Sequence, residues 1–312
     1  MRGILHWCAA ILGTVALLVA AVALALRFWP SSQVPILAVT SVSPIVLGIS
    51  VVVALTCLAS IRAFWRLGVA ALLAVAGVWL QAPYFVAVGG AVDDPITVLT
   101  SNVMFGRADV DALARLTRDQ AVDVLAVQEL TPQEADAIAK SPIAEQLPYS
   151  FVRADADAQG TAIYSRFPLA EQTEYPGFVF NQVSVVVTVP GHGVVQVFAV
   201  HPVPPTLTSR WDRELEQIDT LIHDVPADRR VVAMGDFNAT GDHAIFRRLL
   251  DGGYRDAGEV AGAGWLPTYP TDKSYPPIVG IDHVLVRGLS AVDTSAHDLA
   301  GTDHRAVSAL VG

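Results

Sequence analysis

Three long apolar runs near the start of the chain limit what it can fold into. Residues 4–26, 34–59 and 67–88 are almost entirely aliphatic and aromatic, and no Asp or Glu precedes Asp93. A helix of about 20 apolar residues crosses the ~30 Å hydrocarbon core of a bilayer. We therefore expect a membrane anchor over residues 1–92, with transmembrane helices at about 4–28, 34–60 and 67–88, and a separate domain over residues 93–312.

Two of these runs allow a second interpretation. The first could be a cleaved signal peptide, but it is longer than the ~7–15 apolar residues of such peptides, and no small-residue cleavage site follows it. The second run contains Pro35 and Pro44. It predicts either a kinked span or a shorter span that begins after Pro44.

The basic residues of the anchor indicate its orientation. Arg2, Arg62 and Arg66 would share one side of the membrane, and Arg27 would lie on the other. Because cytoplasmic loops carry the excess of Lys and Arg, the N-terminus is expected in the cytoplasm. Three spans would then place the second domain outside the cytoplasmic (inner) membrane, as part of a multi-pass protein of the cell envelope.

Charge and cysteine content narrow the partners of the second domain. From Asp93 onward the chain has 16 basic and 30 acidic residues, which gives a formal charge of −14. Such a domain is a poor general ligand for nucleic acid, which is bound mainly through Lys and Arg. Both cysteines, Cys8 and Cys57, lie in the anchor. The cysteine-free second domain is compatible with an oxidising exterior.

The pattern from residue 93 onward is that of an α/β domain. A helix is expected to start at Thr131, an N-cap followed by Pro132 and, three residues after the cap, Glu134. A Pro-Gly-His-Gly hairpin turn is expected at residues 190–193. Short apolar runs predict strands at 96–103, 122–127, 161–165, 183–189, 194–200, 231–234, 281–286 and 306–311, and helices are expected at 109–121, 208–223 and 242–250.

Polar residues follow several of these strands, at the end of the sheet where open α/β folds bind their ligands and substrates. They are Asn102, Glu129, His201, Asp236, Asn238, Asp282, Asp303 and His304. Carboxylates and an amide without cysteine suit a hard cation such as Mg²⁺, with Mn²⁺ as a second possibility. Histidines beside acids suit phosphoryl chemistry, which needs proton transfer and charge neutralisation.

The order of the motifs SNV, QEL, GTAIYS, HP, GDFN, IDHVLV and TDHR resembles that of the endonuclease/exonuclease/phosphatase superfamily over about residues 95–310. This resemblance implies a four-layered α/β sandwich, in which two packed mixed β-sheets are flanked by helices. It also implies a metal-dependent phosphohydrolase. Single motifs of this set are weak, but all seven in order are specific.

The resemblance assigns roles to matching positions. Glu129, Asn102 and Asp303 would hold the metal. Asp236 would hold and deprotonate the attacking water, and Asn238 would orient that water or contact the phosphate. His201 would donate to a phosphate oxygen, and His304, oriented by Asp282, would stabilise the charged transition state. Many family members carry an acid where this chain has Met104, and they differ over which group is acid or base, so the metal shell and these roles stay open.

Other interpretations of these residues exist. Glu129 could cap the following helix, and Asp282 could form an ordinary core ion pair. His283 is expected on the opposite strand face, in a structural role, and His192 in a solvated turn. No partner pattern marks His223, His243 or His297. Arg210 and Trp211 could bind a phosphate or a lipid, but a solvated Arg and a packed Trp are favoured.

The substrate is not determined by the fold. The acidic domain, the anchor and a linker of only a few residues after Val88 favour a lipid-linked phosphate in the bilayer over nucleic acid. The arrangement resembles the VanJ-like group of bacterial membrane proteins, which implies a polyprenyl diphosphate substrate. A membrane-tethered extracellular nuclease or phosphodiesterase is the alternative. A non-catalytic domain that binds a lipid or a cell-wall protein is a second one. The oligomeric state is not indicated.

Overall fold

The computed structural model describes residues 2–312, which form two compact units. Of the described residues, one unit contains 2–83 together with 242–244, and the other contains 84–241 and 245–312. Near the start of the second unit, Val88 and Gly89 both donate to the carbonyl of Val260.

The first unit contains three helices that are long and apolar enough to cross a membrane: α1 (Arg2–Leu26), α3 (Ser43–Ser60) and α4 (Phe64–Gln81), the last continued by η1 (Ala82–Phe85). The second apolar run is divided, with α2 (Val34–Ser41) ahead of α3. A new helix begins beside Pro44 because proline fits the first helical turn, where its missing N–H is not needed. The run thus forms a shorter apolar helix that begins at Ser43 rather than one kinked helix.

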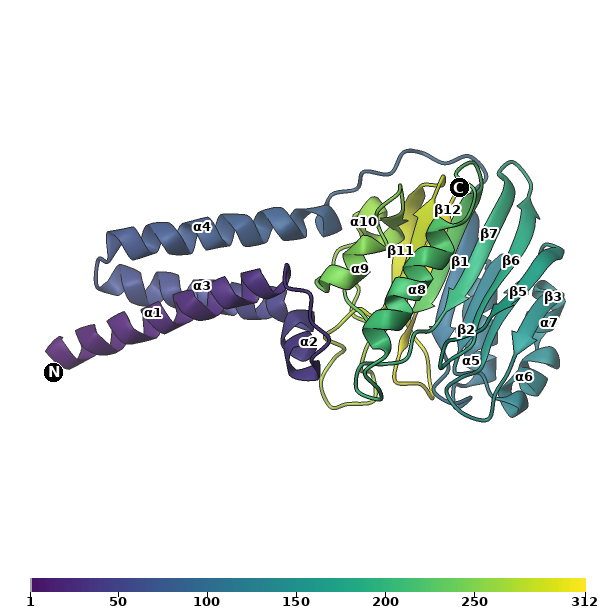
Figure 1. Cartoon of the computed structure of the whole chain (residues 1–312), viewed down its shortest axis with the longest axis horizontal. Coiled ribbons are helices and arrows are strands. Elements are labelled where there is room, and N and C mark those ends of the chain that lie inside the picture. The colour runs from purple at the N-terminus through teal and green to yellow at the C-terminus, as the bar shows by residue number, and fades with distance from the viewer. Residues whose placement is uncertain (1) are drawn as a thin grey trace. The chain divides into compact units, whose positions relative to one another are not determined.

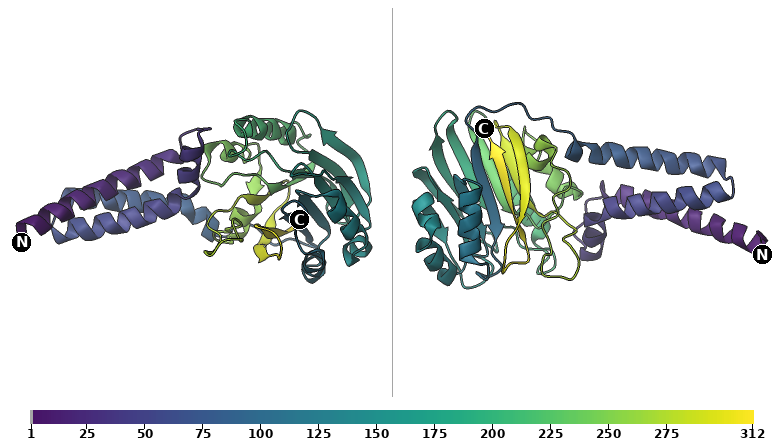
Figure 2. Two further views of the ribbon diagram at one scale, coloured as in Figure 1. Left: turned by 90° about the horizontal axis from the view of Figure 1, so that it is seen from below. Right: turned by 180° about the vertical axis from the view of Figure 1, so that it is seen from behind.

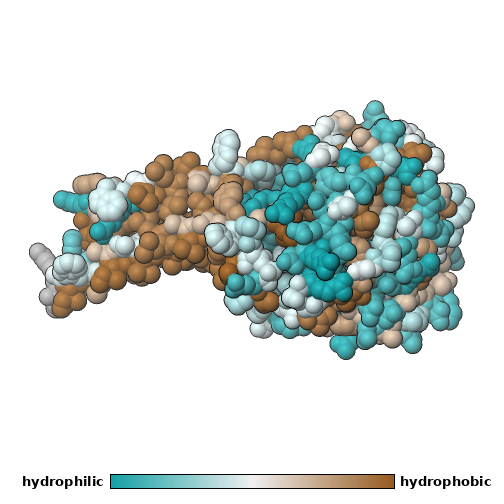
Figure 3. Space-filling model, viewed as in Figure 1, coloured by the Kyte–Doolittle hydropathy of each residue, from teal (hydrophilic) through white to brown (hydrophobic). Residues whose placement is uncertain are grey.

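Small residues let these helices pack closely. A methyl group on Gly13 would meet Leu58, and one on Gly77 would meet Leu47, as is typical of helix pairs in membranes. The outward-facing residues Leu72, Val75 and Trp79 are each at least 67% exposed. Figure 3 shows the resulting hydrophobic surface over these helices.

The second unit contains two six-stranded mixed sheets that face each other (Figures 1 and 2). The first has the order β11-β12-β1-β2-β4-β3 and the second β5-β6-β7-β8-β10-β9. The strands are β1 (Ile96–Asn102), β2 (Val124–Gln128), β3 (Tyr149–Arg153), β4 (Thr161–Ser165), β5 (Leu169–Tyr175), β6 (Gln182–Val189), β7 (Gly193–Val200), β8 (Arg230–Asp236), β9 (Arg255–Asp256), β10 (Asp282–Arg287), β11 (Ala291–Asp298) and β12 (Arg305–Val311).

Helices cover the outer faces of the sheets, which confirms the expected layered α/β sandwich. Leu99 and Leu125 of the first sheet pack under α5 (Val110–Asp119), α6 (Pro132–Ala139) and α7 (Pro142–Gln146). The outer side of the second sheet carries α8 (Trp211–His223), as Figure 2 shows. Two short helices, α9 (Ala244–Arg248) and α10 (Ala257–Ala261), complete the fold.

The eight expected strands are present, as is the helix with its Thr131 cap. The expected helix at 242–250 is shorter and covers only Ala244–Arg248. Strands β3, β5, β9 and β11 were not predicted. β5 is largely exposed, and β5 and β11 both consist mainly of polar residues, so neither has an apolar run.

Alternation along the strands places the polar strand ends between the sheets. Val98 of β1, Val197 of β7, Val232 of β8 and Val284 of β10 all lie in the core between the sheets. Successive side chains of a strand point to opposite faces, so an even spacing keeps two residues on one face. Asn102, His201, Asp236 and Asp282 are each an even number of positions from these valines. The same core that packs the two sheets therefore directs these four polar side chains into the space between them.

Candidate active site

The polar residues meet because the strands that carry them run in register. Asn102, the last residue of β1, pairs with Gln128, the last residue of β2, and Glu129 follows directly. Asp236, at the end of β8, lies opposite Asp282, at the start of the antiparallel β10. Val200 of β7 pairs with Gly235 of β8, so the next residue, His201, lies at the same end of the sheet as Asp236.

Asp236 is at the centre of the group and is 2% exposed. One of its oxygens, Oδ2, accepts from Asn102 Nδ2 at 3.2 Å. The same oxygen lies 3.7 Å from His201 Nε2 and 3.7 Å from His304 Nε2. Burial raises the pKa of Asp236 to about 7, while His304 opposes this rise. One carboxylate is thus flanked by two imidazoles, one from each sheet.

Glu129 lies beside this carboxylate in a left-handed backbone conformation, with φ 57°. Its Oε1 accepts from Asn102 Nδ2 at 3.0 Å, and its Oε2 accepts from the backbone N–H of Phe105 at 3.1 Å. Burial raises its pKa. The N-cap of α6 is Thr131, so Glu129 does not cap that helix. A strained backbone at a partly buried acid is typical of a functional site.

His304 is held by Asp282 through an Nδ1 to Oδ2 distance of 2.9 Å. Burial disfavours its charge, but Asp282 and Asp236 outweigh burial and raise its pKa to about 10. Thr302 supports it, since its Oγ1 accepts from the His304 N–H and donates to the carbonyl of Asn102. His304 is therefore a buried imidazolium whose Nε2 faces Asp236.

His201 has the opposite electrostatic character. Burial, followed by the nearby positive His304, lowers its pKa to about 3, so its ring is neutral. The side chain of Gln182 holds its backbone on both sides, accepting from the His201 N–H and donating to its carbonyl, each at 2.7 Å. The site thus combines one neutral and one charged histidine.

Asn238 is also fixed by several bonds and has a left-handed backbone, with φ 49°. Its N–H donates to Asp236 Oδ1 at 2.8 Å, and its Nδ2 donates to the carbonyl of Pro202 at 3.0 Å. Its own carbonyl accepts from Trp211 Nε1. These bonds link the loop after β8 to the loop after β7.

The donor set fits a divalent cation in two overlapping ways. Glu129 Oε1 accepts from the amide of Asn102, and Asp303 is close enough that its charge raises the pKa of Glu129. Ligand atoms of Asp236, Asp282 and His304 also lie within 4.8 Å of one another. We favour the Glu129 group for the cation, because His304 and Asp282 are already bonded to each other and hard cations prefer oxygen ligands.

The structure corrects one expectation and shows residues that the motifs do not mark. His192 is buried rather than solvated, and its Nε2 lies 2.9 Å from the carbonyl of Asp94. His283 points away from Asp282, as expected, and contacts Asp256. Gln182 carries no local signal of its role. Thr302 could have been found from its place in the TDHR motif.

Comparisons with known proteins agree with this geometry. Residues 99–304 match the Endonuclease/Exonuclease/phosphatase family, and the chain belongs to that family. No curated protein matches the chain in sequence.

Several solved structures share the fold. A humanized TDP2 of D. rerio has 17% identity and a TM-score of 0.60, covering 70% of this chain and 100% of that one. A family protein from Leptotrichia buccalis C-1013-b has 15% identity and a TM-score of 0.56, covering 70% and 99%. Sphingomyelinase C from Streptomyces griseocarneus has 19% identity and a TM-score of 0.50, covering 70% and 99%.

Proposed function

We propose that this protein is a membrane-anchored, divalent-metal-dependent phosphohydrolase. The proposal rests mainly on the environment of Asp236 Oδ2. His201 Nε2 and His304 Nε2 each lie 3.7 Å from this oxygen. A carboxylate between a neutral and a charged imidazole can accept a proton from water beside groups that donate to a phosphate.

Each side chain then has a defined task. Asp236, once ionised, accepts the proton of the attacking water. His304, kept charged by Asp282, neutralises negative charge that builds on phosphate oxygens. His201, neutral and rigidly held by Gln182, donates a hydrogen bond to the phosphate from Nε2. A divalent cation held by Glu129, with Asn102 and Asp303, would offset the phosphate charge further.

The substrate that we propose is a lipid-linked phosphate, specifically a polyprenyl diphosphate at the outer face of the cytoplasmic membrane. Three observations support it: the membrane-spanning helices, the charge of −14 after residue 92, and the resemblance to the VanJ-like group. The distribution of Arg residues in the anchor supports the external position. A water-soluble nucleic acid would gain nothing from the anchor and would be repelled by the charge.

The test is phosphate release from undecaprenyl diphosphate by the full-length protein in detergent with Mg²⁺. We expect release by the wild type and a loss of about 10²–10⁴-fold in Asp236→Ala, the range that a positioned general base contributes. No release from any lipid phosphate would refute the lipid assignment. The fold also occurs in a D. rerio TDP2 solved with a single-strand DNA product, so nicking of plasmid DNA without lipid would support the nuclease alternative.

A further inference from the structure

Three consecutive residues after β1 have a left-handed backbone beside the candidate metal site. Met104, Phe105 and Gly106 have φ angles of 47°, 56° and 66°. This conformation is ordinary for glycine, but for a bulky side chain such as that of phenylalanine it is an outlier that the surrounding structure must enforce. We call Met104 and Phe105 the apolar turn.

Neighbouring loops hold the apolar turn in this shape. A methyl group on Gly106 would collide with Thr131 Oγ1 at the start of α6, and one on Gly301 would collide with the carbonyl oxygen of Arg107. The N–H of Arg107 donates to the carbonyl of Val103 at 2.9 Å and so closes the turn. The backbone therefore has little freedom to relax.

Both residues of the apolar turn are bonded directly to residues of the site. The N–H of Met104 donates to Asn102 Oδ1 at 2.9 Å, and the N–H of Phe105 donates to Glu129 Oε2 at 3.1 Å. Asn102 Nδ2 in turn donates to Glu129 Oε1 and to Asp236 Oδ2. Two apolar residues are thus attached next to the carboxylates that would meet a phosphate.

Packing inside the protein does not account for the side chain of Phe105. It is 46% exposed, whereas Phe198, Phe237 and Phe246 of the same unit are at most 2% exposed. Glycine or asparagine would adopt the left-handed turn more easily. A half-exposed phenyl group at a strained position therefore gains most from an apolar contact that the free protein does not make.

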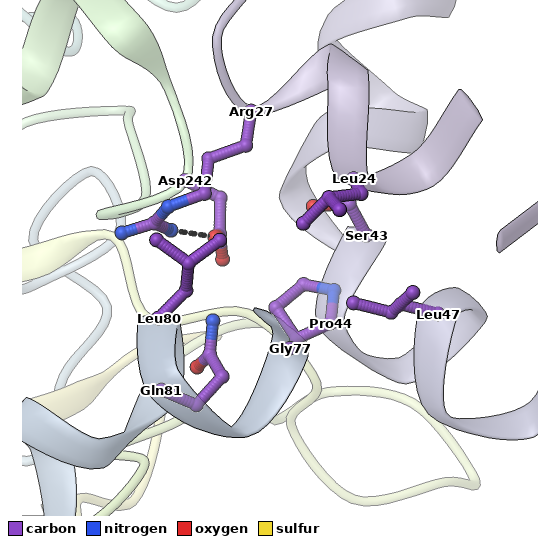
Figure 4. Close-up of a pocket in the computed structure, with 9 residues that line it drawn as sticks. All are labelled: Leu24, Arg27, Ser43, Pro44, Leu47, Gly77, Leu80, Gln81 and Asp242. Carbon is purple, nitrogen blue, oxygen red and sulfur yellow. Dashed lines mark hydrogen bonds and ion pairs between the residues drawn. The ribbon is translucent and has the colours of Figure 1, made fainter. Parts of the chain in front are cut away.

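The pocket among the long apolar helices is too small to hold an isoprenoid chain. This cavity of about 10 Å³ is lined mainly by residues of α1, α3 and α4, among them Leu24, Leu47 and Leu80 (Figure 4). Such a volume admits about one water molecule. The apolar part of a substrate must therefore be contacted outside this pocket.

We propose that Phe105 is a specificity-determining residue, which contacts the apolar chain of the substrate next to its phosphate. Met104, whose thioether side chain is flexible, adapts to the same chain. The occupant is an isoprenoid chain rather than a nucleobase, because the charge of −14 after residue 92 disfavours nucleic acid. The identity of the substrate rests on the proposed function, but binding by Phe105 is measurable without turnover.

The experiment measures binding to the full-length protein in detergent with Mg²⁺, in an Asp236→Asn background that stops turnover. Farnesyl diphosphate carries an isoprenoid chain, and inorganic pyrophosphate carries none. Phe105→Asn removes the ring and still allows the left-handed turn. We expect it to weaken farnesyl diphosphate binding by roughly tenfold, because apolar burial is lost, and to leave pyrophosphate binding within about twofold. Phe105→Leu, which stays apolar, should keep most of the farnesyl diphosphate binding.

Tyr149→Asn is the matched control. Tyr149 is a 42% exposed aromatic residue of the same sheet. It pairs with Ser165, which pairs with Val124 at the start of β2, so it lies at the end of the sheet opposite to Glu129. This variant should bind both diphosphates as the Asp236→Asn background does, and Tyr149→Asn alone should release phosphate as the wild type does.

Thermal unfolding separates a binding role from a structural one. Phe105→Asn should melt at the temperature of its parent or higher, because the strain is relieved. A lower melting temperature with an equal loss of both diphosphates would overturn the proposal. If the asparagine variant does not fold, Phe105→Gly decides by the same measurements.

Two further outcomes are informative. Weaker binding of a short thymidine oligonucleotide to Phe105→Asn, with farnesyl diphosphate binding unchanged, would assign the ring to base stacking and overturn the proposal. If the wild type releases no phosphate from undecaprenyl diphosphate but farnesyl diphosphate binding still depends on Phe105, the proposed function fails and the apolar contact is supported.

Discussion

Two histidines from different sheets, His304 just before β12 and His283 on β10, show how single contacts separate catalytic from structural roles. His304 is buried and His283 is partly buried, and each has Nδ1 beside a carboxylate: Asp282 for His304 at 2.9 Å and Asp256 for His283 at 2.7 Å. The two histidines differ in the group that their Nε2 atom faces. His304 Nε2 faces the reactive carboxylate, whereas His283 Nε2 lies 3.0 Å from the carbonyl of Ala239. Both nitrogens of His283 face acceptors, an arrangement that favours the charged ring and joins it to the active-site loop.

His283 leads to a prediction about pH and stability. Burial disfavours its charge, but the bond to Asp256 outweighs burial and raises its pKa above the ordinary value. Its stabilisation is therefore complete below about pH 6.5, the pKa of an unfolded histidine, and is lost as the pH rises through the higher folded-state pKa. His283→Phe should lower the unfolding free energy by about 3–5 kcal/mol near pH 6, the cost of breaking a buried pair, and by less at high pH.

Thermal unfolding of the wild type and of His283→Phe in detergent, between pH 5.5 and 10, measures this difference in stability. His297 provides a control of opposite sign, because burial lowers its pKa. His297→Gln should therefore gain stability relative to the wild type as the pH falls. A His283→Phe deficit that grows with pH would contradict the assignment of a charged His283.

At the scale of elements, the parallel pair β7 and β8 determines where the reactive carboxylate lies. Val200 and Gly235 are partners in this pair, one residue before His201 and Asp236. A methyl group at Gly235 would collide with the carbonyl oxygen of Val200. The glycine of the GDFN motif thus allows the two strands to approach closely, and this approach brings His201 next to Asp236.

Gly235→Ala should force these strands apart at the site. We expect a loss of about 1–3 kcal/mol of unfolding free energy, the usual cost of overpacking, together with a loss of phosphate release larger than unfolding explains. Gly90→Ala is the matched control, because nothing lies within 4 Å of an added methyl group there. Melting temperature and turnover are measured on both variants, and a Gly235→Ala protein as active and stable as the control would refute this role.

At the scale of the whole molecule, an apolar unit with four basic and no acidic residues before Asp93 is joined to an acidic domain. Three of the four basic residues, Arg2, Arg62 and Arg66, fall on one side of the expected spans. This asymmetry predicts the orientation of the chain, since positive residues near the ends of spans are retained in the cytoplasm.

Reporter fusions check the orientation. Alkaline phosphatase fused after Gly312 should be active, and a fluorescent protein that folds only in the cytoplasm should be dark at the same position. Fusions after Ile61, between α3 and α4, should give the reverse pattern. A bright cytoplasmic reporter at Gly312 would place the active site inside the cell and would exclude an external lipid substrate.

Much of the fold follows from local sequence. The apolar runs of the anchor and the strands 96–102, 183–189 and 194–200 are rich in β-branched and other apolar residues. Their secondary structure therefore depends mainly on neighbours in the chain. Strand β5, with few apolar residues, had no such signal and forms because β6 beside it offers a free edge. Strand alternation also explains why Asn102, His201, Asp236 and Asp282 could be expected to share one site.

The sequence by itself determined the long apolar helices, the main strands and the residues of the GDFN and TDHR motifs, because periodicity and short spacing are local properties. Only the tertiary structure showed the contacts between distant segments: Gln182 on the backbone of His201, and Asp256 on His283. No local pattern encodes such a pair, because which buried polar group meets which partner depends on how the strands and loops pack in three dimensions.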